Sequence, residues 1–465
     1  MRVRAGLNRM EGLAIAAITV LVICREWGVA PWATHALPVL VLGVMAVFAF
    51  QVRLSRKVFI AVAVGLSVAL ALSDPGWWDV VLRGLGSAAF IAAFFTALAT
   101  LRSVAQTSPA IQSAGQFLSE QKPGRRYAAL TIGGQMFSLL LNYGAIQLLG
   151  SLAMSNATTE PNAEIRAHRI RRMLLAIQRG FISSLAWSPL SFAMAISTTM
   201  VPGTSWAKAV LPGLVTAGIV ASIGWALDTI FKPRLSVAPN PRSAPEGSWF
   251  AMTPLVLLLG ILVVSVTTLY FNTGVRIVGL VALIVPVMAL VWMLIQHWGD
   301  APLRRTATRI RDYVTVEVPG YRGELTLLMM AGYIGTVGAA LLGPLVARSG
   351  LDVAALPAWV ILVSFVWIIP LAGQVGMNPI LAVTLIAPLI PDASALGVTP
   401  TALVVAITAG WTLSGASSPY TATTLLIGSF AKISALRVGL QWNGAYTLIC
   451  AVVLSVWVVI YGLVL

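Results

Sequence analysis

Charge is the scarcest property of this chain. Asp, Glu, Lys and Arg together make up 10% of its 465 residues, whereas hydrophobic residues make up 58%. A soluble domain carries about 25% charged residues. The many apolar runs close to the roughly 20 residues that cross a bilayer indicate a polytopic membrane protein instead. Two cysteines at opposite ends, Cys24 and Cys450, exclude a disulfide framework, and three scattered histidines exclude a histidine metal cluster.

The charge that is present is mostly basic. There are 30 Lys and Arg against 15 Asp and Glu, an excess of +15. The bases flank hydrophobic runs, where they set membrane topology, and they do not indicate a nucleic-acid partner. Their positions predict a multi-pass protein of a bacterial inner (cytoplasmic) membrane, with the lipid bilayer as a partner, a cytoplasmic N-terminus and an extracytoplasmic C-terminus.

One segment occurs twice. Residues 176–189 read AIQRGFISSLAWSP and residues 406–419 read AITAGWTLSGASSP, and seven of the fourteen positions match. About one match is expected by chance from this composition. The matched residues include Gly180/Gly410, Ser184/Ser414, Ser188/Ser418 and Pro189/Pro419.

Each copy lies inside a hydrophobic run that is long enough to span the membrane. Proline removes a backbone donor and glycine lowers helix propensity, so each run is expected to be a broken span, over 173–200 and 401–428. Backbone groups freed in lipid must find partners in protein or in a water-filled cavity. Two interrupted spans at corresponding places indicate a transporter binding site. A pair of kinked helices that pack through small residues is the alternative.

The flanking charges predict the remaining organisation. Both flanks of the apolar run 127–150 are basic, whereas neither flank of the apolar run 357–391 is basic. A run whose two flanks belong on the same side of the membrane is expected to enter and leave on that side, which favours re-entrant hairpins with tips at Asn142 and Asn378. An ordinary span over 127–150 is the alternative. Residues 160–172 are expected to form a separate amphipathic helix at the interface.

The predicted fold is therefore all-α and polytopic, with about eleven transmembrane helices and two re-entrant hairpins in an inverted repeat. An extra N-terminal span, a first repeat, a cytoplasmic linker rich in Pro and Ser and a second repeat occupy residues 1–35, 36–230, 231–248 and 249–465. Inverted repeats of this kind are typical of alternating access.

This pattern resembles the ion transporter superfamily, most closely the divalent-anion/sodium symporters that carry dicarboxylates and citrate. Members have a Ser-Asn-Thr signature at each hairpin tip. Here the tips read Leu141-Asn142-Tyr143 and Met377-Asn378-Pro379, so the Asn is kept and the flanking Ser and Thr are absent. The resemblance implies that the tips bind substrate carboxylate, that sodium ions lie between tips and broken spans, and that the protein is a homodimer.

The broken spans and tips supply the predicted site. Serine and threonine hydroxyls and asparagine amides can bind an oxyanion or coordinate a cation, and a membrane arginine is by default a functional hypothesis. Bonding of the hydroxyls back to their own helix, and snorkelling of Arg179 to water, are the alternatives. A sodium ion, as coupling ion, is expected near Asn142, Ser184, Asn378 and Ser414, and no other cofactor is expected. The predicted substrate-binding residues are Asn142, Arg179, Ser184, Ser188, Pro189, Asn378, Ser414, Ser417, Ser418, Pro419 and Thr421.

These features predict a secondary active transporter of a small organic anion, similar to a di- or tricarboxylate, coupled to sodium or protons, and not an enzyme. None of the fifteen acidic residues lies in the middle of a predicted span, which disfavours an exchanger that carries protons on a membrane carboxylate. A sodium/proton antiporter or a metalloid exporter of the same superfamily is one alternative. A multi-span glycan polymerase or ligase, which needs a large extracytoplasmic loop for its chemistry, is the other.

Overall fold

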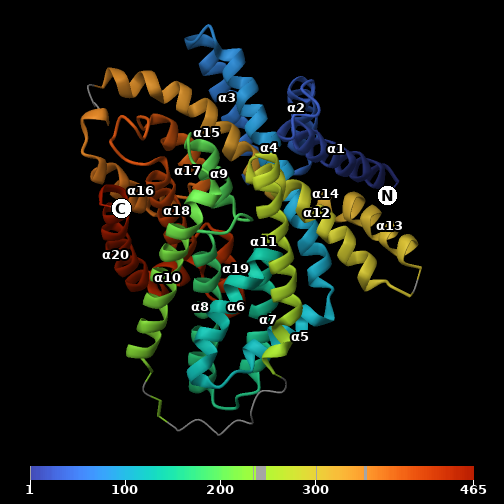
Figure 1. The fold of residues 1–465 in the computed structure, drawn as a ribbon, viewed down its shortest axis with the longest axis vertical. Coiled ribbons are helices and arrows are strands. Elements are labelled where there is room, and N and C mark those ends of the chain that lie inside the picture. Colours follow the sequence, from blue (N-terminus) through green and yellow to red (C-terminus); the bar gives the residue numbers. More distant parts are fainter. Residues whose placement is uncertain (1, 234, 237–247, 300, 350–352, 465) are drawn as a thin grey trace. The chain divides into compact units, whose positions relative to one another are not determined.

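A computed structural model describes residues 2–233, 235–236, 248–299, 301–349 and 353–464. Every regular element within these residues is a helix, and none of them forms a strand (Figure 1). The prediction of an all-α polytopic membrane protein is confirmed. Most of the predicted linker 231–248 lies outside the described residues.

The chain divides into two compact units. The first unit contains Met1–Val104, Leu262–Val353 and Ile380–Pro391, and the second contains Ala105–Ile261, Ala354–Pro379 and Asp392–Leu465. All eleven predicted substrate-binding residues belong to the second unit.

The first unit is built mainly from long apolar helices. In it α15 packs on α3, and the hydroxyls of Ser67 and Tyr333 lie 2.6 Å apart across that contact. Its helices are α1 (Arg2–Glu26), α2 (Ala33–Gln51), α3 (Leu54–Ser73), α4 (Trp77–Gln106), α12 (Ile277–Gln296), α13 (Pro302–Asp312), the π-helical η2 (Tyr313–Glu317), α14 (Val318–Gly320), α15 (Arg322–Arg348), most of α17 (Pro379–Ile386) and η4 (Ala387–Leu389). Three elements are divided between the units: α4 and η3 (Val353–Ala355) begin in the first unit and end in the second, and α11 (Thr253–Thr273) begins in the second and ends in the first.

The second unit is organised around two buried helices, α8 and α18. Helix α8 packs against α6 and α7, and α18 packs against α16 and α20. The helices of this unit are α5 (Pro109–Ser119), α6 (Pro123–Leu141), α7 (Gly144–Thr158), α8 (Ala163–Ser184), α9 (Phe192–Met200), α10 (Trp206–Ile230), η1 (Trp249–Met252), α16 (Ala358–Gln374), α18 (Pro400–Ser417), α19 (Ala422–Ala431), the π-helical η5 (Arg437–Trp442) and α20 (Gly444–Leu463).

Nine helices in the described part of the chain are long and apolar enough to cross a membrane. Nine is the number of predicted transmembrane helices that remain when the two broken spans are left out of the eleven. The two predicted broken spans are not among them, because α8 carries charges in its first half and α18 is rich in small and polar residues. The nine helices are Gly6–Glu26, Ala33–Gln51, Leu54–Ser73, Trp77–Gln106, Trp206–Ile230, Trp249–Thr273, Ile277–Gln296, Arg322–Arg348 and Gly444–Leu463.

Helix α8 begins earlier than the sequence suggested. The prediction of a separate amphipathic helix over 160–172 was wrong, because this stretch continues without a break into the buried helix that follows. The Asn162 side chain accepts hydrogen bonds from the backbone amides of Glu164 and Ile165 and so starts the helix. No glycine or proline follows until Gly180, so nothing in the local sequence ends the helix between its polar and apolar halves.

Candidate functional site

The repeated tract lies where two helices of the second unit are interrupted. Helix α8 ends at Ser184 and α9 begins at Phe192, while α18 ends at Ser417 and α19 begins at Ala422. All residues from Met173 to Ser184 and from Thr401 to Ser417 are buried. Both helices are therefore buried up to the point of interruption, whereas the second interruption itself reaches the surface at Tyr420, which is 63% exposed.

The two copies share their local hydrogen bonds. The Ser188 hydroxyl accepts from the Leu190 amide at 3.1 Å, and the Ser418 hydroxyl accepts from the Tyr420 amide at 3.3 Å. The amide of each of these serines also donates to the carbonyl four residues earlier, at 2.9 Å in both copies. Pro189 and Pro419 follow directly and have no N–H group, so the series of helical backbone hydrogen bonds ends there. The same serine–proline chemistry thus ends a helix twice.

The second halves restart in the same register. Ser191 precedes α9 and Thr421 precedes α19, and these positions are 230 residues apart, like the repeat itself. Ser191 caps its helix, since its hydroxyl accepts from the Met194 amide at 3.1 Å. Both hydroxyls also donate to the carbonyl three residues earlier, Ser191 to Ser188 at 2.9 Å and Thr421 to Ser418 at 3.0 Å. The copies therefore share this bond and differ in the cap, which Thr421 does not form.

The glycine shared by the copies sets a close helix contact in each. A Cβ atom on Gly180 would overlap the carbonyl oxygen of Thr131 on α6. A Cβ atom on Gly410 would overlap the carbonyl oxygen of Phe365 on α16 in the same manner. Only glycine lets the two backbones approach so closely. Each broken helix is therefore pressed onto the helix that leads to an asparagine tip.

The shared serines Ser184 and Ser414 have different partners. Ser184 donates to the Phe181 carbonyl at 2.7 Å and accepts from the Ser138 hydroxyl of α6 at 2.8 Å. The Ser414 hydroxyl is fully buried and has no hydrogen-bond partner among the described residues. It lies beside Gly373 of α16, whose carbonyl accepts from Ser418 at 2.6 Å. A buried hydroxyl with no partner can serve a bound ion or substrate group.

We expect the two serines to respond oppositely to alanine when no ligand is bound. Ser184→Ala should lower the free energy of unfolding by about 1 kcal/mol, because it removes the hydrogen bond that joins α8 to Ser138 of α6. Ser414→Ala should leave it unchanged or raise it by about 1 kcal/mol, because it removes a desolvated hydroxyl without a bond. Thermal unfolding of both variants in sodium-free buffer measures the difference. Equal destabilisation by both variants would contradict this assignment.

The second interruption is richer in hydroxyls than the first. Ser417 donates to the Leu413 carbonyl at 2.9 Å and accepts from the Gln374 side chain at 3.3 Å. Thr424 donates to the Ser418 carbonyl at 2.6 Å, and Thr423 donates to the Gly415 carbonyl. These threonines were not among the predicted residues. Their bonds hold the loop between α18 and α19 in place.

The predicted tip residues lie between consecutive helices. Asn142 separates α6 from α7 and has backbone angles of φ 49° and ψ −131°. This is close to the first central position of a type II′ turn, where glycine is the usual residue. Among the described residues no hydrogen bond engages the partly exposed Asn142 side chain. Asn378 is also partly exposed and lies between the end of α16 and Pro379, the first residue of α17.

Arg179 is buried in a polar network and does not reach the aqueous surface. Its side chain donates to Asn443 Oδ1 at 3.2 Å and to Tyr127 Oη at 3.0 Å. Its guanidinium carbon lies 4.1 Å from the centre of the Tyr446 ring, a cation–π contact. It is 5% exposed and forms no ion pair within the described part of the chain. The snorkelling alternative is therefore wrong.

The sequence did not single out Gln178, Tyr127 or Asn443, which complete this network. The Asn443 amide donates to Gln178 Oε1 at 3.0 Å. The Gln178 amide in turn points to the carbonyls of Gly415 and Ala416, at 3.4 Å each. Gln178 is the only fully buried glutamine within the described residues, and a polar side chain at that position of a hydrophobic run is a signal that could have found it.

The two broken helices meet in the second unit. A Cβ atom on Gly415 of α18 would crowd the Ile182 side chain of α8, and Gln178 joins the last turn of α18 to α8. Carbonyl oxygens at the ends of α8 and α18 attract cations, and the amides that begin α9 and α19 attract anions. Carbonyls and hydroxyls are ligands for sodium, and the described residues contain no group of three or more His, Cys, Asp or Glu that could hold another metal.

The fold matches two solved transporter structures. The YdaH transporter of Alcanivorax borkumensis aligns with a TM-score of 0.52 and 16% identity, over 87% of this chain and 98% of YdaH. MtrF of Neisseria gonorrhoeae, described as illuminating a class of antimetabolite efflux pumps, aligns with a TM-score of 0.54 and 14% identity, over 89% of this chain and 96% of MtrF. At these identities the likeness shows a common fold. No protein-family model and no curated protein matches the chain.

Proposed function

We propose that this protein is a secondary active transporter of a small organic anion. The observation that carries the proposal is the pair of interrupted, buried helices that share one Gly-Ser-Pro tract and contact each other inside one unit. Interrupted helices of this kind form substrate and ion sites in transporters. The likeness to YdaH and MtrF supports a transporter over a membrane enzyme.

An anionic substrate fits the chemistry of the interruptions. Asn142, Ser184 and Ser414 offer amide and hydroxyl groups, and none of the residues from Met173 to Ser184 or from Thr401 to Ser417 is acidic. The carbonyl ends of α8 and α18 suit a sodium ion that travels with the anion. We further propose that the substrate is a di- or tricarboxylate and that its transport is coupled to sodium or protons. The homodimer and the predicted membrane orientation also stay proposals.

Export of an antimetabolite is the second candidate. The likeness to MtrF favours it, since that protein is described within a class of antimetabolite efflux pumps. The same amide and hydroxyl groups would bind an antimetabolite that carries a carboxylate, whether the protein imports or exports it. Counterflow of labelled dicarboxylates and of labelled antimetabolite acids in liposomes, with sodium and proton gradients imposed in turn, distinguishes the two candidates and identifies the coupling ion.

Replacing Asn142 tests the proposed site directly. Asn142→Gly should leave the free energy of unfolding unchanged or raise it by up to about 1 kcal/mol, because glycine adopts the observed positive φ more readily. Loss of an amide that binds a charged group costs about 1.5–3 kcal/mol, which corresponds to a 10- to 100-fold loss in substrate affinity. Counterflow in liposomes and thermal unfolding measure the two effects separately.

A matched control is Asn272→Ala, which removes an exposed amide of the first unit. We expect it to transport as well as the wild type. Transport by Asn142→Gly at the wild-type level would remove Asn142 from the site. A transport-inactive wild type, tested over organic acids and both gradients, would overturn the proposed function itself.

A further inference from the structure

Helix α13 of the first unit carries an apolar stripe on an otherwise basic surface. It reads PLRRTATRIRD and contains four arginines and one acid. Leu303, Ala307 and Ile310 are three or four positions apart, so they share one face of the helix. All three are exposed, and Leu303 is 77% exposed. An exposed apolar stripe on a basic helix is typical of helices that lie on a membrane surface.

Two arginines beside this stripe have no partner in the protein. Arg304 and Arg311 are exposed, and no hydrogen bond or ion pair engages either side chain within the described residues. They are seven positions apart, which is two helical turns, so they lie on the same side of α13. Arg309 is held differently, because its Nη2 atom lies 3.0 Å from Glu317 Oε1 and donates to the Ser103 hydroxyl at 2.7 Å. Arg309 therefore anchors α13, while Arg304 and Arg311 are available to a ligand.

The rest of the helix leaves this face open. Asp312, the one acid of α13, follows Leu303 by nine positions, which is two and a half turns, so it lies on the opposite side of the helix. Thr306 is 3% exposed and marks the side that packs on the protein, where α13 contacts α12 and η2. The apolar stripe and its two arginines are thus neither covered nor neutralised within the described residues.

The neighbouring helices keep α13 close to the membrane surface. Helix α12 ends at Gln296 and α15 begins at Arg322, and both are long and apolar enough to cross a membrane. The residues 297–301 between α12 and α13 can span about 20 Å at most when fully extended, and α13 packs on α12. Trp298 in this connection is 82% exposed, and tryptophan is enriched at the level of the lipid head groups.

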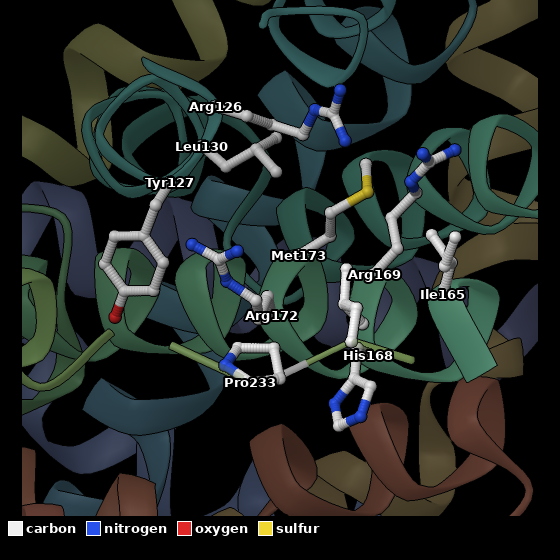
Figure 2. Close-up of a pocket in the computed structure, with 10 residues that line it drawn as sticks. Arg126, Tyr127, Leu130, Ile165, His168, Arg169, Arg172, Met173 and Pro233 are labelled. Carbon is white, nitrogen blue, oxygen red and sulfur yellow. The ribbon is translucent and has the colours of Figure 1, made fainter. Parts of the chain in front are cut away.

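The arginines of α6 and α8 differ from these two. A cavity of about 100 Å³ in the second unit is lined by Arg126 of α6 and by Arg169 and Arg172 of α8 (Figure 2). Arg172 Nη2 lies 2.6 Å from Asp228 Oδ2, and Arg169 Nη2 lies 2.9 Å from Glu160 Oε2. The charges of Arg169 and Arg172 are therefore balanced inside the protein, unlike those of the two exposed arginines of α13.

We propose that α13 is a docking helix for anionic phospholipid. It lies in the plane of the membrane surface with Leu303 and Ile310 among the acyl chains, and Arg304 and Arg311 bind phosphate oxygens of the head groups. The planar fork of N–H donors on arginine matches phosphate geometry. Basic segments next to membrane spans are attracted to anionic lipid. This occupant is favoured over a protein because α13 directly follows a membrane span and its unpaired charges are positive. The proposal does not depend on which solute is transported.

The first experiment measures how deeply α13 lies in the membrane. A nitroxide label is attached at Leu303→Cys or, as the matched control on the polar face, at Thr308→Cys, which is also exposed. The full chain carries alanine in place of Cys24 and Cys450 and is reconstituted in vesicles of phosphatidylglycerol and phosphatidylcholine. We expect oxygen, which concentrates among the acyl chains, to relax the label at position 303, and a water-soluble nickel chelate to relax the label at position 308.

The second experiment measures lipid preference with both native cysteines in place. The full chain in an uncharged detergent is titrated with phosphatidylglycerol and with phosphatidylcholine of the same acyl chains, and bound lipid is counted by native mass spectrometry. Arg304→Gln/Arg311→Gln should lower the preference for phosphatidylglycerol roughly 10- to 30-fold, the effect of two arginines near a charged surface. The matched control is Arg83→Gln/Arg348→Gln, which removes two exposed arginines of the same unit outside α13 and should bind like the wild type.

Insertion of position 303, together with a phosphatidylglycerol preference that only the α13 variant loses, would support the proposal. Equal access of the nickel chelate to positions 303 and 308 would overturn it, as would an α13 variant that keeps the wild-type preference. Protection of position 303 that increases with the amount of protein per lipid would identify a protein on this face and would also overturn it. If the chain without cysteines does not fold, the lipid preference decides alone.

Discussion

Gly180→Ala and Gly410→Ala should each destabilise the protein by about 3 kcal/mol or more and abolish transport. In both variants the new methyl group would overlap a backbone carbonyl of the neighbouring helix, at Thr131 or at Phe365. A carbonyl on a packed helix cannot rotate away as a flexible side chain can, so the helices must separate. Thermal unfolding and size-exclusion chromatography in detergent measure the loss of stability, and counterflow in liposomes measures transport.

Gly218→Ala is the matched control for both glycine variants. It also lies in a helix of the second unit, but an added Cβ there meets no atom within 4 Å. Alanine has the higher helix propensity, so this variant should be as stable as the wild type or more stable by about 0.5–1 kcal/mol. If Gly180→Ala and Gly410→Ala unfold at the same temperature as Gly218→Ala, the close contacts of Gly180 with Thr131 and of Gly410 with Phe365 do not exist in the protein.

Arg179→Met should also cost about 3 kcal/mol or more of stability. The substitution keeps an apolar side chain of similar length but removes the donors to Asn443 and Tyr127. Each buried polar group left without its partner costs about 1–3 kcal/mol. The cation–π contact with Tyr446 is lost as well. Thermal unfolding in the absence of substrate measures this effect without reference to transport.

The same variant distinguishes two roles for Arg179. If Arg179 holds α6, α8 and the start of α20 together, Arg179→Met should lower stability whether or not substrate is present. If Arg179 only binds substrate, the variant should lose transport and unfold like the wild type, and that result would contradict the network. Arg171→Met is the matched control, because Arg171 lies two turns earlier on α8 and is exposed. We expect it to unfold within about 1 kcal/mol of the wild type, because it loses only an exposed cation–π contact with Trp442.

The polar network shows where prediction from sequence reaches its limit. Arg179 stood out because it is an ionisable residue in an apolar run. Its partners come from positions 52 and 264 residues away, at Tyr127 and Asn443, and no local pattern connects them. The assignment of Arg179 to substrate binding rested on its charge alone and stays a prediction, whereas its contacts with Asn443 and Tyr127 are found only in the structure.

The repeated serines also combine a bond that depends on local sequence with one that does not. Ser188 and Ser418 accept the same local bond from the amide two residues on, because that bond depends only on the neighbouring backbone. Ser184 and Ser414 occupy equivalent positions, yet one bonds to Ser138 and the other has no partner among the described residues. The difference comes from the helix packed against each, which the repeat does not specify.

The sequence alone determined that this is a polytopic helical membrane protein, and it marked the tracts at which α8 and α18 end. The hydrophobic composition shows that the chain is stable in a lipid bilayer. Glycine and proline affect the backbone within one helical turn, so the ends of the two helices can be predicted from the local sequence. Only the tertiary structure decided which groups face the two interruptions, what holds Arg179, and that the bases of α6 and α8 line one cavity. Those contacts depend on residues brought together from distant parts of the chain by packing.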